Sequence, residues 1–390
     1  MNKNADAVII GGGILGASTL YYLAKMGLRN TILLEKGNLA CGSSGDSAAM
    51  VRQHYSNEVS IRLVKESLRF FQNFADEFSE EGVFRQTGWV FLCPPEAKDS
   101  FDLNMDRLIR LGVRTNEISL DDAKELISGL NTDEIGSIAF EPDSGYADPK
   151  RTIGALVSRS EHMGAVVHTQ TPATGLIIRN GRMCGVSTPE GNISTPIVIN
   201  TAGPWAYQVG LWAGLELPLT ISREQDIVIE PPEDSPTLDL VVSNMVDRTY
   251  FRPIGERSIL AGVGHPKENE PADPNNYNRE ASKEFISDIV SRIEHRFPSL
   301  RGSKVTSSWA GLYTITPDWN TMVGPTPEIE GLFLGVGGSG HSFKLGPAIG
   351  MCLADLILQG SSSRIDISPL SPDRFSKGVP LRSTYGGNRG

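Results

Sequence analysis

The fold is decided by residues 5–36, which read ADAVIIGGGILGASTLYYLAKMGLRNTILLEK. An apolar run at 7–10 predicts a buried strand, and the pattern G-x-G-x-x-G follows at 11–16. Apolar residues then recur at helical spacing, and a second apolar run at 31–34 ends on Glu35. Strand, glycines, helix, strand and acid fall within about 30 residues in the order that a dinucleotide-binding βαβ unit requires.

Each part of this motif has a physical role. Gly11 permits the tight turn, Gly13 lets a pyrophosphate approach the backbone, and Gly16 lets the helix pack close to the strand. The free N–H groups at the helix N-terminus attract phosphate. Glu35 can accept the ribose hydroxyls, and its charge disfavours the 2′-phosphate of NADP. The motif predicts a bound dinucleotide, FAD or NAD; an empty βαβ unit is the alternative.

Composition narrows the class of protein. The chain has 390 residues, 39% hydrophobic and 21% charged, with a net charge of -10, which suits a soluble globular protein of two domains. The sequence contains no Lys/Arg cluster of the kind that indicates nucleic-acid binding. No apolar run approaches the roughly 20 residues of a membrane span. The chain enters its first strand without a leader, so we expect a cytoplasmic protein. The four cysteines are widely separated, and we expect no metal site.

A second glycine-rich loop follows a strand and precedes a helix, as the first loop does. An apolar strand at 332–336 runs into residues 337–344, and a helix follows to Gly360. A strand at 197–201 likewise leads to Gly203. Because ligands in such sheets bind at the carboxyl ends of the strands, these loops are expected to meet at one site.

The rest of the chain predicts an α/β fold, α+β overall, in which a discontinuous nucleotide domain is interleaved with a mixed or antiparallel sheet domain. The alternating pattern over 221–264 indicates the antiparallel strands of the second domain. The polar, Gly/Ser-rich end of the chain suggests a loosely held tail. The predicted division is 1–85, 145–215 and 308–370 for the nucleotide domain, 86–144 and 216–307 for the substrate domain, and 371–390 for the tail.

At this point the chain resembles the D-amino-acid oxidase-like superfamily of FAD enzymes. The branch is that of sarcosine oxidase, glycine oxidase, dimethylglycine dehydrogenase and the β-subunits of sarcosine oxidase and proline dehydrogenase. The resemblance covers residues 6 to about 370 and favours FAD over NAD. It is carried by VIIGGGILGASTLYYLA (8–24) with Glu35, MVRQHYS (50–56), GYADPKR (145–151), VINTAGPWA (198–206), WAGLYTITPDWNTMVG (309–324) and GVGGSGHSFKLGPAIG (335–350).

The resemblance implies a Rossmann-like FAD-binding domain and a set of cofactor contacts. The helix that begins near 342 would place its positive end near the flavin and stabilise the reduced, anionic form. The implied positions are Gly11, Gly13, Ile14, Leu15, Gly16, Glu35 and Lys36 for the ADP half, Ser43, Ser44, Ala48, Ala49 and Met50 for the pyrophosphate and flavin, Ala173 and Gly203 for the nucleotide, and Gly311, Gly338, Ser339, Gly340, His341, Ser342, Phe343 and Lys344 for the flavin.

Two departures from the family pattern matter. Gly311 stands where some relatives attach FAD through Cys, and residues 43–47 hold no His that could serve others, so we expect non-covalent FAD. Leu260 stands at the approximate position of a Lys that promotes reaction with O2 in monomeric sarcosine oxidases. The electron acceptor, O2 or a partner protein, is left open.

The family's substrates are small amino acids, often N-methylated, whose carboxylate needs a cation. Arg52 and Lys344 match the two cationic positions, with a structural ion pair and a surface lysine as the alternatives. Tyr250 and Tyr313 are candidate pocket walls, or equally buried structural tyrosines.

Two histidines and one acid complete the candidate residues. His54 and His341 could tune the protonation of the substrate amine, or could be satisfied core histidines. Asp318 is expected to be structural, holding its own turn.

The resemblance implies an FAD-dependent oxidoreductase that oxidises the C–N bond of a small, possibly N-methylated or cyclic, amino acid. Hydride transfer to the flavin would give an imine that hydrolyses. The alternatives are the β-subunit of a hetero-oligomeric dehydrogenase that passes electrons to a partner, and a non-catalytic FAD-binding assembly factor. A 2-hydroxy acid substrate and an oligomeric state are also open.

Overall fold

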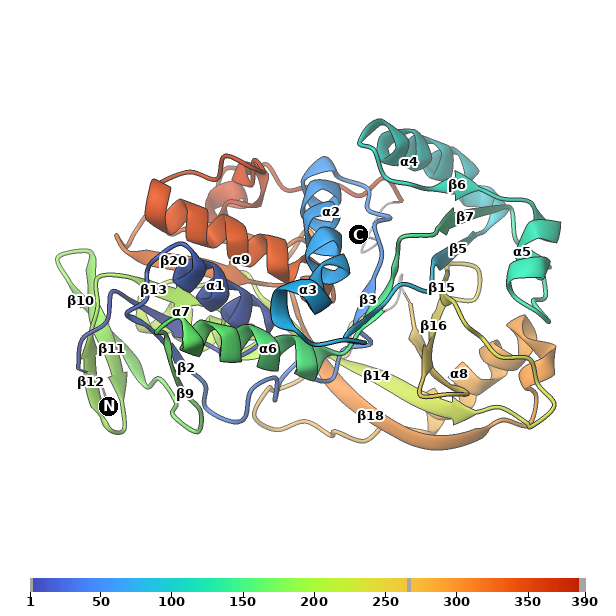
Figure 1. Ribbon diagram of the computed structural model, residues 1–390, viewed down its shortest axis with the longest axis horizontal. Helices are drawn as coiled ribbons and strands as arrows, with labels where there is room; N and C mark the ends of the chain where they lie inside the picture. Colours follow the sequence, from blue (N-terminus) through green and yellow to red (C-terminus); the bar gives the residue numbers. More distant parts are fainter. Residues whose placement is uncertain (1–2, 265–267, 386–390) are drawn as a thin grey trace.

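The computed structural model describes residues 3–264 and 268–385. Its central layer is a six-stranded sheet in the order β19–β20–β13–β1–β2–β9, parallel except for the antiparallel edge strand β19 (Figure 1). β1 and β2 are buried along their whole length, as expected for parallel strands covered on both faces. The strands are β1 (Ala7–Ile10), β2 (Thr31–Leu34), β9 (Val166–His168), β13 (Val198–Asn200), β19 (Met322–Pro325) and β20 (Leu332–Val336).

Helices cover one face of this sheet. α1 (Ile14–Lys25) lies between α6 (Pro149–His162) and α9 (Ser342–Gln359), and α2 (Glu58–Gln72) packs on α9. α1 and α9 approach closely because α9 has glycines at the crossing: a Cβ on Gly350 would lie 2.5 Å from the Cβ of Ser18. Asp148-Pro149 is a pattern that predicts a helix start, an N-cap followed by Pro at the first position, and Asp148 does cap α6 before Pro149.

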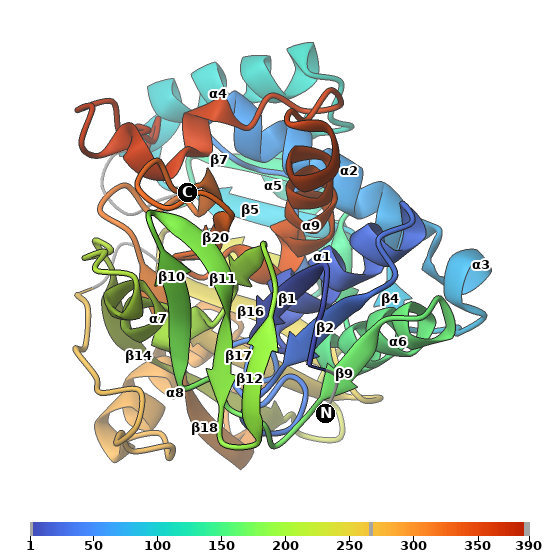
Figure 2. The same ribbon diagram turned by 90° about the vertical axis from the view of Figure 1, so that its left-hand side faces the viewer.

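The opposite face carries a small antiparallel sheet and α7 (Ala206–Trp212) (Figure 2). Its strands are β10 (Gly175–Arg179), β11 (Arg182–Thr188) and β12 (Gly191–Ser194). Asn180-Gly181 between two apolar runs predicts a hairpin, which is confirmed: both residues have positive φ, 52° and 74°, as a two-residue type I′ turn requires.

The second layer is an eight-stranded sheet in the order β18–β14–β17–β16–β15–β5–β7–β6. All pairs are antiparallel except β5 with β15. α8 (Lys283–Arg296) packs on one side of it around a separate apolar core. The strands are β5 (Trp89–Cys93), β6 (Asn116–Glu117), β7 (Ser137–Glu141), β14 (Thr220–Glu230), β15 (Val241–Asn244), β16 (Thr249–Ile254), β17 (Ser258–Val263) and β18 (Lys304–Ile315).

Three short strands form a further small sheet, and three more α-helices lie within residues 74–126. β3 (Met50–Val51), β8 (Gly145–Ala147) and β4 (Phe84–Arg85) form a small sheet in the order β3–β8–β4. The sequence predicts a long helix capped by Ser56 or Asn57; Asn57 is the cap, but the helix breaks at Asn73, and α3 (Phe74–Phe78) continues the apolar stripe. Helical patterns near 98–111 and 120–128, the second opened by Ser119-x-x-Asp122, correspond to α4 (Lys98–Arg110) and α5 (Leu120–Leu126), and α5 has that capping box.

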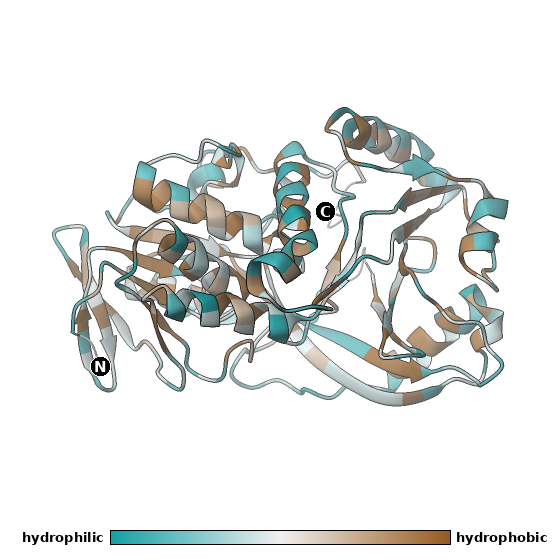
Figure 3. Cartoon of the chain, viewed as in Figure 1, coloured by the Kyte–Doolittle hydropathy of each residue, from teal (hydrophilic) through white to brown (hydrophobic). Residues whose placement is uncertain are grey.

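The predicted domain boundary at 307/308 falls inside β18, which is one continuous strand from the eight-stranded sheet to the nucleotide region. The division of the chain into domains therefore stays a proposal. Figure 3 shows hydrophobic residues along the strands of the central sheet, while α2 turns hydrophilic residues outward.

The expectation of a loosely held tail is wrong for residues 371–385. Arg374 is only 2% exposed, because it forms a buried ion pair with Asp318. The chain after it packs against the centre of the molecule through Tyr385. Residues 386–390 of the predicted tail lie outside the described residues. Within the described ranges, no helix combines the length and the apolar character that crossing a membrane demands.

Candidate active site

A cavity of about 340 Å³ opens at the carboxyl ends of the central parallel strands. Both predicted glycine-rich loops contribute to it, as the strand order requires. The cofactor candidates that line it are Gly11, Gly13, Ile14, Leu15, Glu35, Lys36, Ser43, Ser44, Ala48, Ala173, Gly203, Gly311, Gly338, Ser339, Gly340, Ser342 and Phe343.

The glycines of the first loop are required by close approach. Gly11 has φ 114°, and a Cβ there would lie 2.5 Å from the carbonyl oxygen of Thr201. A Cβ on Gly16 would lie 1.9 Å from the carbonyl oxygen of Gly11. Gly16 lines neither cavity of the site; it closes the helix onto the strand, which is the role expected from the motif.

Two polar groups in this cavity indicate a polar ligand. Glu35 is 7% exposed, and the backbone N–H groups of Gly12 and Gly37 donate to its two carboxylate oxygens at 2.7 and 2.8 Å. These bonds orient the acid at the end of β2. The Ser43 hydroxyl is buried and has no hydrogen-bond partner among the described residues. A buried hydroxyl without a partner calls for a ligand or water to satisfy it.

The second glycine-rich loop brings the start of α9 to the same cavity. Gly340 has φ 81°, and a Cβ there would lie 2.4 Å from the ring of Tyr313. The loop therefore lies against β18 because residue 340 has no side chain. Ser342 and Phe343, in the first turn of α9, line the cavity.

A second cavity, of about 150 Å³, adjoins the first. The two share wall residues, among them Ala48, Tyr250 and Tyr313. Four residues that were predicted as cofactor contacts line this second cavity instead of the first. They are Ala49, Met50, His341 and Lys344.

The second cavity contains two cations, Arg52 and Lys344. Lys344 is 7% exposed, and burial holds its pKa well below the ordinary value, with Arg52 lowering it further. Arg52 donates to the carbonyl oxygen of His54 and lies over the ring of Tyr55. Among residues 3–264 and 268–385, no carboxylate lies within ion-pair distance of either cation. The predicted alternatives, a structural ion pair and a surface lysine, therefore do not hold in the described structure.

Behind the cations lies a buried acid that sequence reasoning missed. Glu141 is fully buried at the end of β7, where the Gln53 N–H and the Ser144 hydroxyl donate to one of its oxygens at 2.8 Å. Its other oxygen lies 3.8 Å from His54 Nδ1. Burial raises the pKa of Glu141 to about 7 and lowers the pKa of His54 to about 3. The sequence does carry one signal for Glu141, which is an acidic residue within the otherwise mostly apolar strand pattern at 137–141.

The remaining candidates lie around the junction of the two cavities, where Tyr250 and Tyr313 are half-buried and His341 is buried. The Tyr250 hydroxyl donates to Asp226 at 2.5 Å, and the Tyr55 hydroxyl lies 3.2 Å from His341 Nδ1. Leu260 is 1% exposed in β17 and is not among the residues that line either cavity. This contradicts its expected place above the flavin.

Asp318 is structural, as expected, and its Oδ1 accepts from the Asn320 backbone at 3.1 Å. Its ion pair with Arg374 was not foreseen. Sequence reasoning also missed three aromatic residues that line the second cavity: Trp89 and Phe91 on β5, and Tyr385 near the end of the chain. The described residues hold no group of three or more His, Cys, Asp and Glu that could bind a metal, and none was predicted.

Comparisons with known proteins agree with this geometry. Human mitochondrial sarcosine dehydrogenase is 29% identical over 92% of this chain, and rat mitochondrial dimethylglycine dehydrogenase is 27% identical over 97%. The chain spans 40% and 46% of the length of these two relatives. The crystal structure of L-proline dehydrogenase from P. horikoshii superposes with a TM-score of 0.91 at 28% identity, covering 98% of this chain and all of that one. The model of the FAD dependent oxidoreductase family matches residues 6–356, so the chain belongs to that family.

Proposed function

We propose that this protein uses FAD to oxidise the C–N bond of a small amino acid. The observation that carries the proposal is a pair of cations, Arg52 and Lys344, in a cavity that adjoins the nucleotide cavity, with no carboxylate of the described residues at ion-pair distance from either. Two cations of this kind, Lys344 buried and Arg52 half-buried, favour an anion, and a carboxylate fits the fork of Arg and the point charge of Lys.

The first cavity fits FAD. The approach of the backbone at Gly11 and Gly13, the oriented carboxylate of Glu35 and the unpartnered hydroxyl of Ser43 suit a dinucleotide. Among the described residues that line it, Cys41, beside Glu35, is the single cysteine, and none is a histidine. We therefore propose that FAD is held non-covalently. When bound, FAD would supply the acceptor for a hydride, which carries two electrons and a proton.

The protein's own residues bind and orient the substrate. Arg52 and Lys344 hold the carboxylate, so that the neighbouring C–H bond points toward the first cavity. Tyr250 and Tyr313, at the junction of the two cavities, exclude water. The imine product hydrolyses in water to a carbonyl compound and an amine.

The substrate amine must lose its proton before its C–H bond can give a hydride. His54 lines the second cavity and is neutral near pH 7, because burial lowers its pKa to about 3. Glu141 lies behind it, with a pKa near 7. We propose that Glu141 accepts this proton from the substrate ammonium, and that His54 relays it by taking a proton on one ring nitrogen and giving one up from the other, so that the ring stays neutral. His341, which also lines the cavity, is proposed to orient Tyr55 through their hydrogen bond.

The relatives narrow the substrate class. They are named for sarcosine, dimethylglycine and proline, and a cavity of about 150 Å³ suits substrates of this size. We propose an N-substituted small amino acid. The electron acceptor is proposed to be O2 or a partner protein.

The first experiment is an anaerobic titration of the purified flavoprotein. Sarcosine, dimethylglycine, proline, glycine and 2-hydroxy acids are added in turn while the flavin spectrum is followed, and air is then admitted. Bleaching by an N-substituted amino acid supports the proposal, and the rate of recolouring in air separates an oxidase from a dehydrogenase. A flavin that none of them bleaches argues for the non-catalytic alternative.

The carboxylate anchor is tested by Arg52→Ala. Loss of a charge-assisted bond worth about 2–3 kcal/mol is expected to raise KM roughly 30- to 150-fold while bound FAD is retained. Arg69→Ala is the control, because Arg69 is exposed on α2 and pairs with Glu66 only. An unchanged KM in Arg52→Ala would remove Arg52 from the site.

We retain the expected cytoplasmic location as part of this proposal; the net charge and composition support it. Cell fractionation with an antibody against the intact chain tests it. Sedimentation of the purified protein decides whether it forms an oligomer.

A further inference from the structure

Tyr385 closes one side of the second cavity, although it lies 331 residues from His54 in the sequence. Its hydroxyl oxygen is 2.8 Å from His54 Nε2. Its ring is stacked on the His54 ring at 5.9 Å between centroids and meets Phe91 edge-on at 5.8 Å. The ring is therefore fixed by a hydrogen bond at its tip and by aromatic contacts on its sides.

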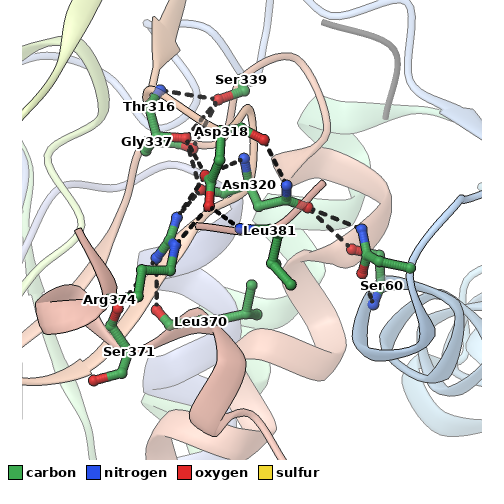
Figure 4. Close-up of polar contacts among 11 residues, drawn as sticks. Ser60, Thr316, Asp318, Asn320, Gly337, Ser339, Leu370, Ser371, Arg374 and Leu381 are labelled. Atoms are coloured by element: carbon green, nitrogen blue, oxygen red, sulfur yellow. Dashed lines mark hydrogen bonds and ion pairs between the residues drawn. The ribbon is translucent and has the colours of Figure 1, made fainter. Parts of the chain in front are cut away.

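The chain that carries Tyr385 is anchored by a buried ion pair (Figure 4). Arg374 donates to both carboxylate oxygens of Asp318 at 2.8 and 2.9 Å, and both side chains are 2% exposed. The backbone N–H of Leu381 donates to the same carboxylate at 2.9 Å. Asp318 thus holds the segment at two points, four residues before Tyr385 and eleven before it.

Ser383 and Thr384 are hydrogen-bonded to α4 and to Ser56, which lies two residues after His54. Arg107 on α4 donates to the Thr384 hydroxyl at 2.7 Å and to the carbonyl oxygen of Ser56. The Ser56 hydroxyl donates to Ser383 at 3.1 Å. In Figure 1 the red segment after α9 runs past α2 toward α4, which agrees with these contacts. Residues 381–385 therefore bridge α4 and the segment that carries His54.

We propose that Tyr385 is a specificity-determining residue, whose ring limits the size of the substituent that an amino-acid substrate can carry. This rests on the proposed function. The ring cannot swing aside without loss of its bond to His54, and residues 381–385 cannot retreat without breaking their bonds to Asp318, Arg107 and Ser56. A substrate with a bulkier side chain or N-substituent would meet the ring, whereas a small one leaves it in place.

Binding of carboxylates that cannot be oxidised tests the size limit. The holoenzyme is titrated with acetate, propionate, butyrate and benzoate, and the dissociation constants are taken from the flavin spectrum. Tyr385→Ala is expected to bind the larger acids at least tenfold more tightly relative to acetate than the wild type does. Tyr385→Phe, which keeps the ring, should preserve the wild-type order, as should Tyr207→Ala, which changes an exposed tyrosine on α7. A wild-type order in Tyr385→Ala overturns the proposal.

Hydrogen exchange provides a measurement that needs no substrate. Tyr385→Ala keeps the anchor at Asp318 and the bonds of Ser383 and Thr384 but lacks the ring. Faster exchange of peptides covering 50–56 and 89–93 is expected, and unchanged exchange overturns the proposal. If exchange rises while the wild type binds none of the acids, Tyr385 is supported as a wall of the cavity, and the proposed amino-acid substrate fails instead.

Discussion

The two adjoining cavities are built in different ways. The nucleotide cavity is shaped largely by backbone, since the loops at 11–16 and 337–340 approach their neighbours only because they lack side chains. The second cavity is shaped by side chains that arrive from remote parts of the chain, such as Arg52, Trp89 and Tyr385. A backbone cradle follows from a short motif, whereas a side-chain cavity depends on how the whole chain packs.

The cavities also differ in electrostatics. Glu35 in the first is satisfied by two backbone N–H groups. In the second, Lys344 is buried without an acidic partner among the described residues, and Glu141 is buried with a raised pKa. The second cavity therefore holds groups that are arranged for a ligand at the expense of fold stability. A substitution that adds a side chain at a glycine should therefore disrupt the first cavity. A substitution that removes a charge should change the stability or the ligand binding of the second cavity.

The largest effect is expected from Gly16→Ala. The added Cβ would lie 1.9 Å from the carbonyl oxygen of Gly11, so the helix must move off the strand. We expect a loss of about 4 kcal/mol or more of stability, together with loss of bound FAD. Thermal unfolding and the flavin content of the purified protein measure both.

Gly154→Ala is the matched control, since Gly154 also lies in a helix but a Cβ there would meet nothing within 4 Å. That change should stabilise the protein by roughly 0.5–1 kcal/mol. Normal flavin content and stability in Gly16→Ala would show that the motif does not need the close approach.

Glu141→Gln should change the pH dependence of stability. Burial raises the pKa of this carboxyl from 4.5 to about 7, so the folded state binds the proton more tightly than the unfolded state does. The stabilising contribution is complete below pH 4.5 and is lost as the pH rises through 7. Relative to the wild type, Glu141→Gln should therefore gain up to about 3 kcal/mol between pH 4.5 and 7.

Urea unfolding of both proteins across this range measures the difference. The groups that face Glu141, among them His54, Arg52 and Asp143, are the same in both proteins and cancel. Glu117→Gln, a change at an exposed position on β6, should leave the pH profile parallel to that of the wild type. A constant difference between wild type and Glu141→Gln would place the titration elsewhere.

Lys344→Met should stabilise the fold slightly while weakening carboxylate binding. Burial lowers the pKa of Lys344, so the unfolded chain binds the proton more tightly, and wild-type stability rises with pH toward the ordinary value of 10.5. The variant should be more stable by about 1–2 kcal/mol at neutral pH, and the gain should disappear as the pH approaches 10.

Melting of the ligand-free holoprotein at several pH values gives this gain, and titration with acetate gives the loss of affinity. The exposed Lys377, paired with Asp373, provides the control Lys377→Met, for which no gain is expected. Lower stability of Lys344→Met at neutral pH would mean that Lys344 has a partner in the folded protein.

The sequence by itself determined the nucleotide half of this protein. The βαβ unit, the second glycine-rich loop and the capped helices at Asn57 and Asp148 all rest on interactions between residues close in the chain. A turn, a cap or a glycine at a helix start requires a particular residue at a particular spacing. These features can therefore be recognised directly from the sequence.

Only the tertiary structure decided the second cavity. Ser342 lines the first cavity, Lys344 lines the second and Phe343 between them lines both, because successive residues of a helix point about 100° apart. Glu141 gained its raised pKa from burial between two distant segments, which spacing does not encode. Tyr385 lies at the site because the ion pair between Arg374 and Asp318 holds the segment that carries it. No local sequence pattern predicts an ion pair between residues 56 positions apart.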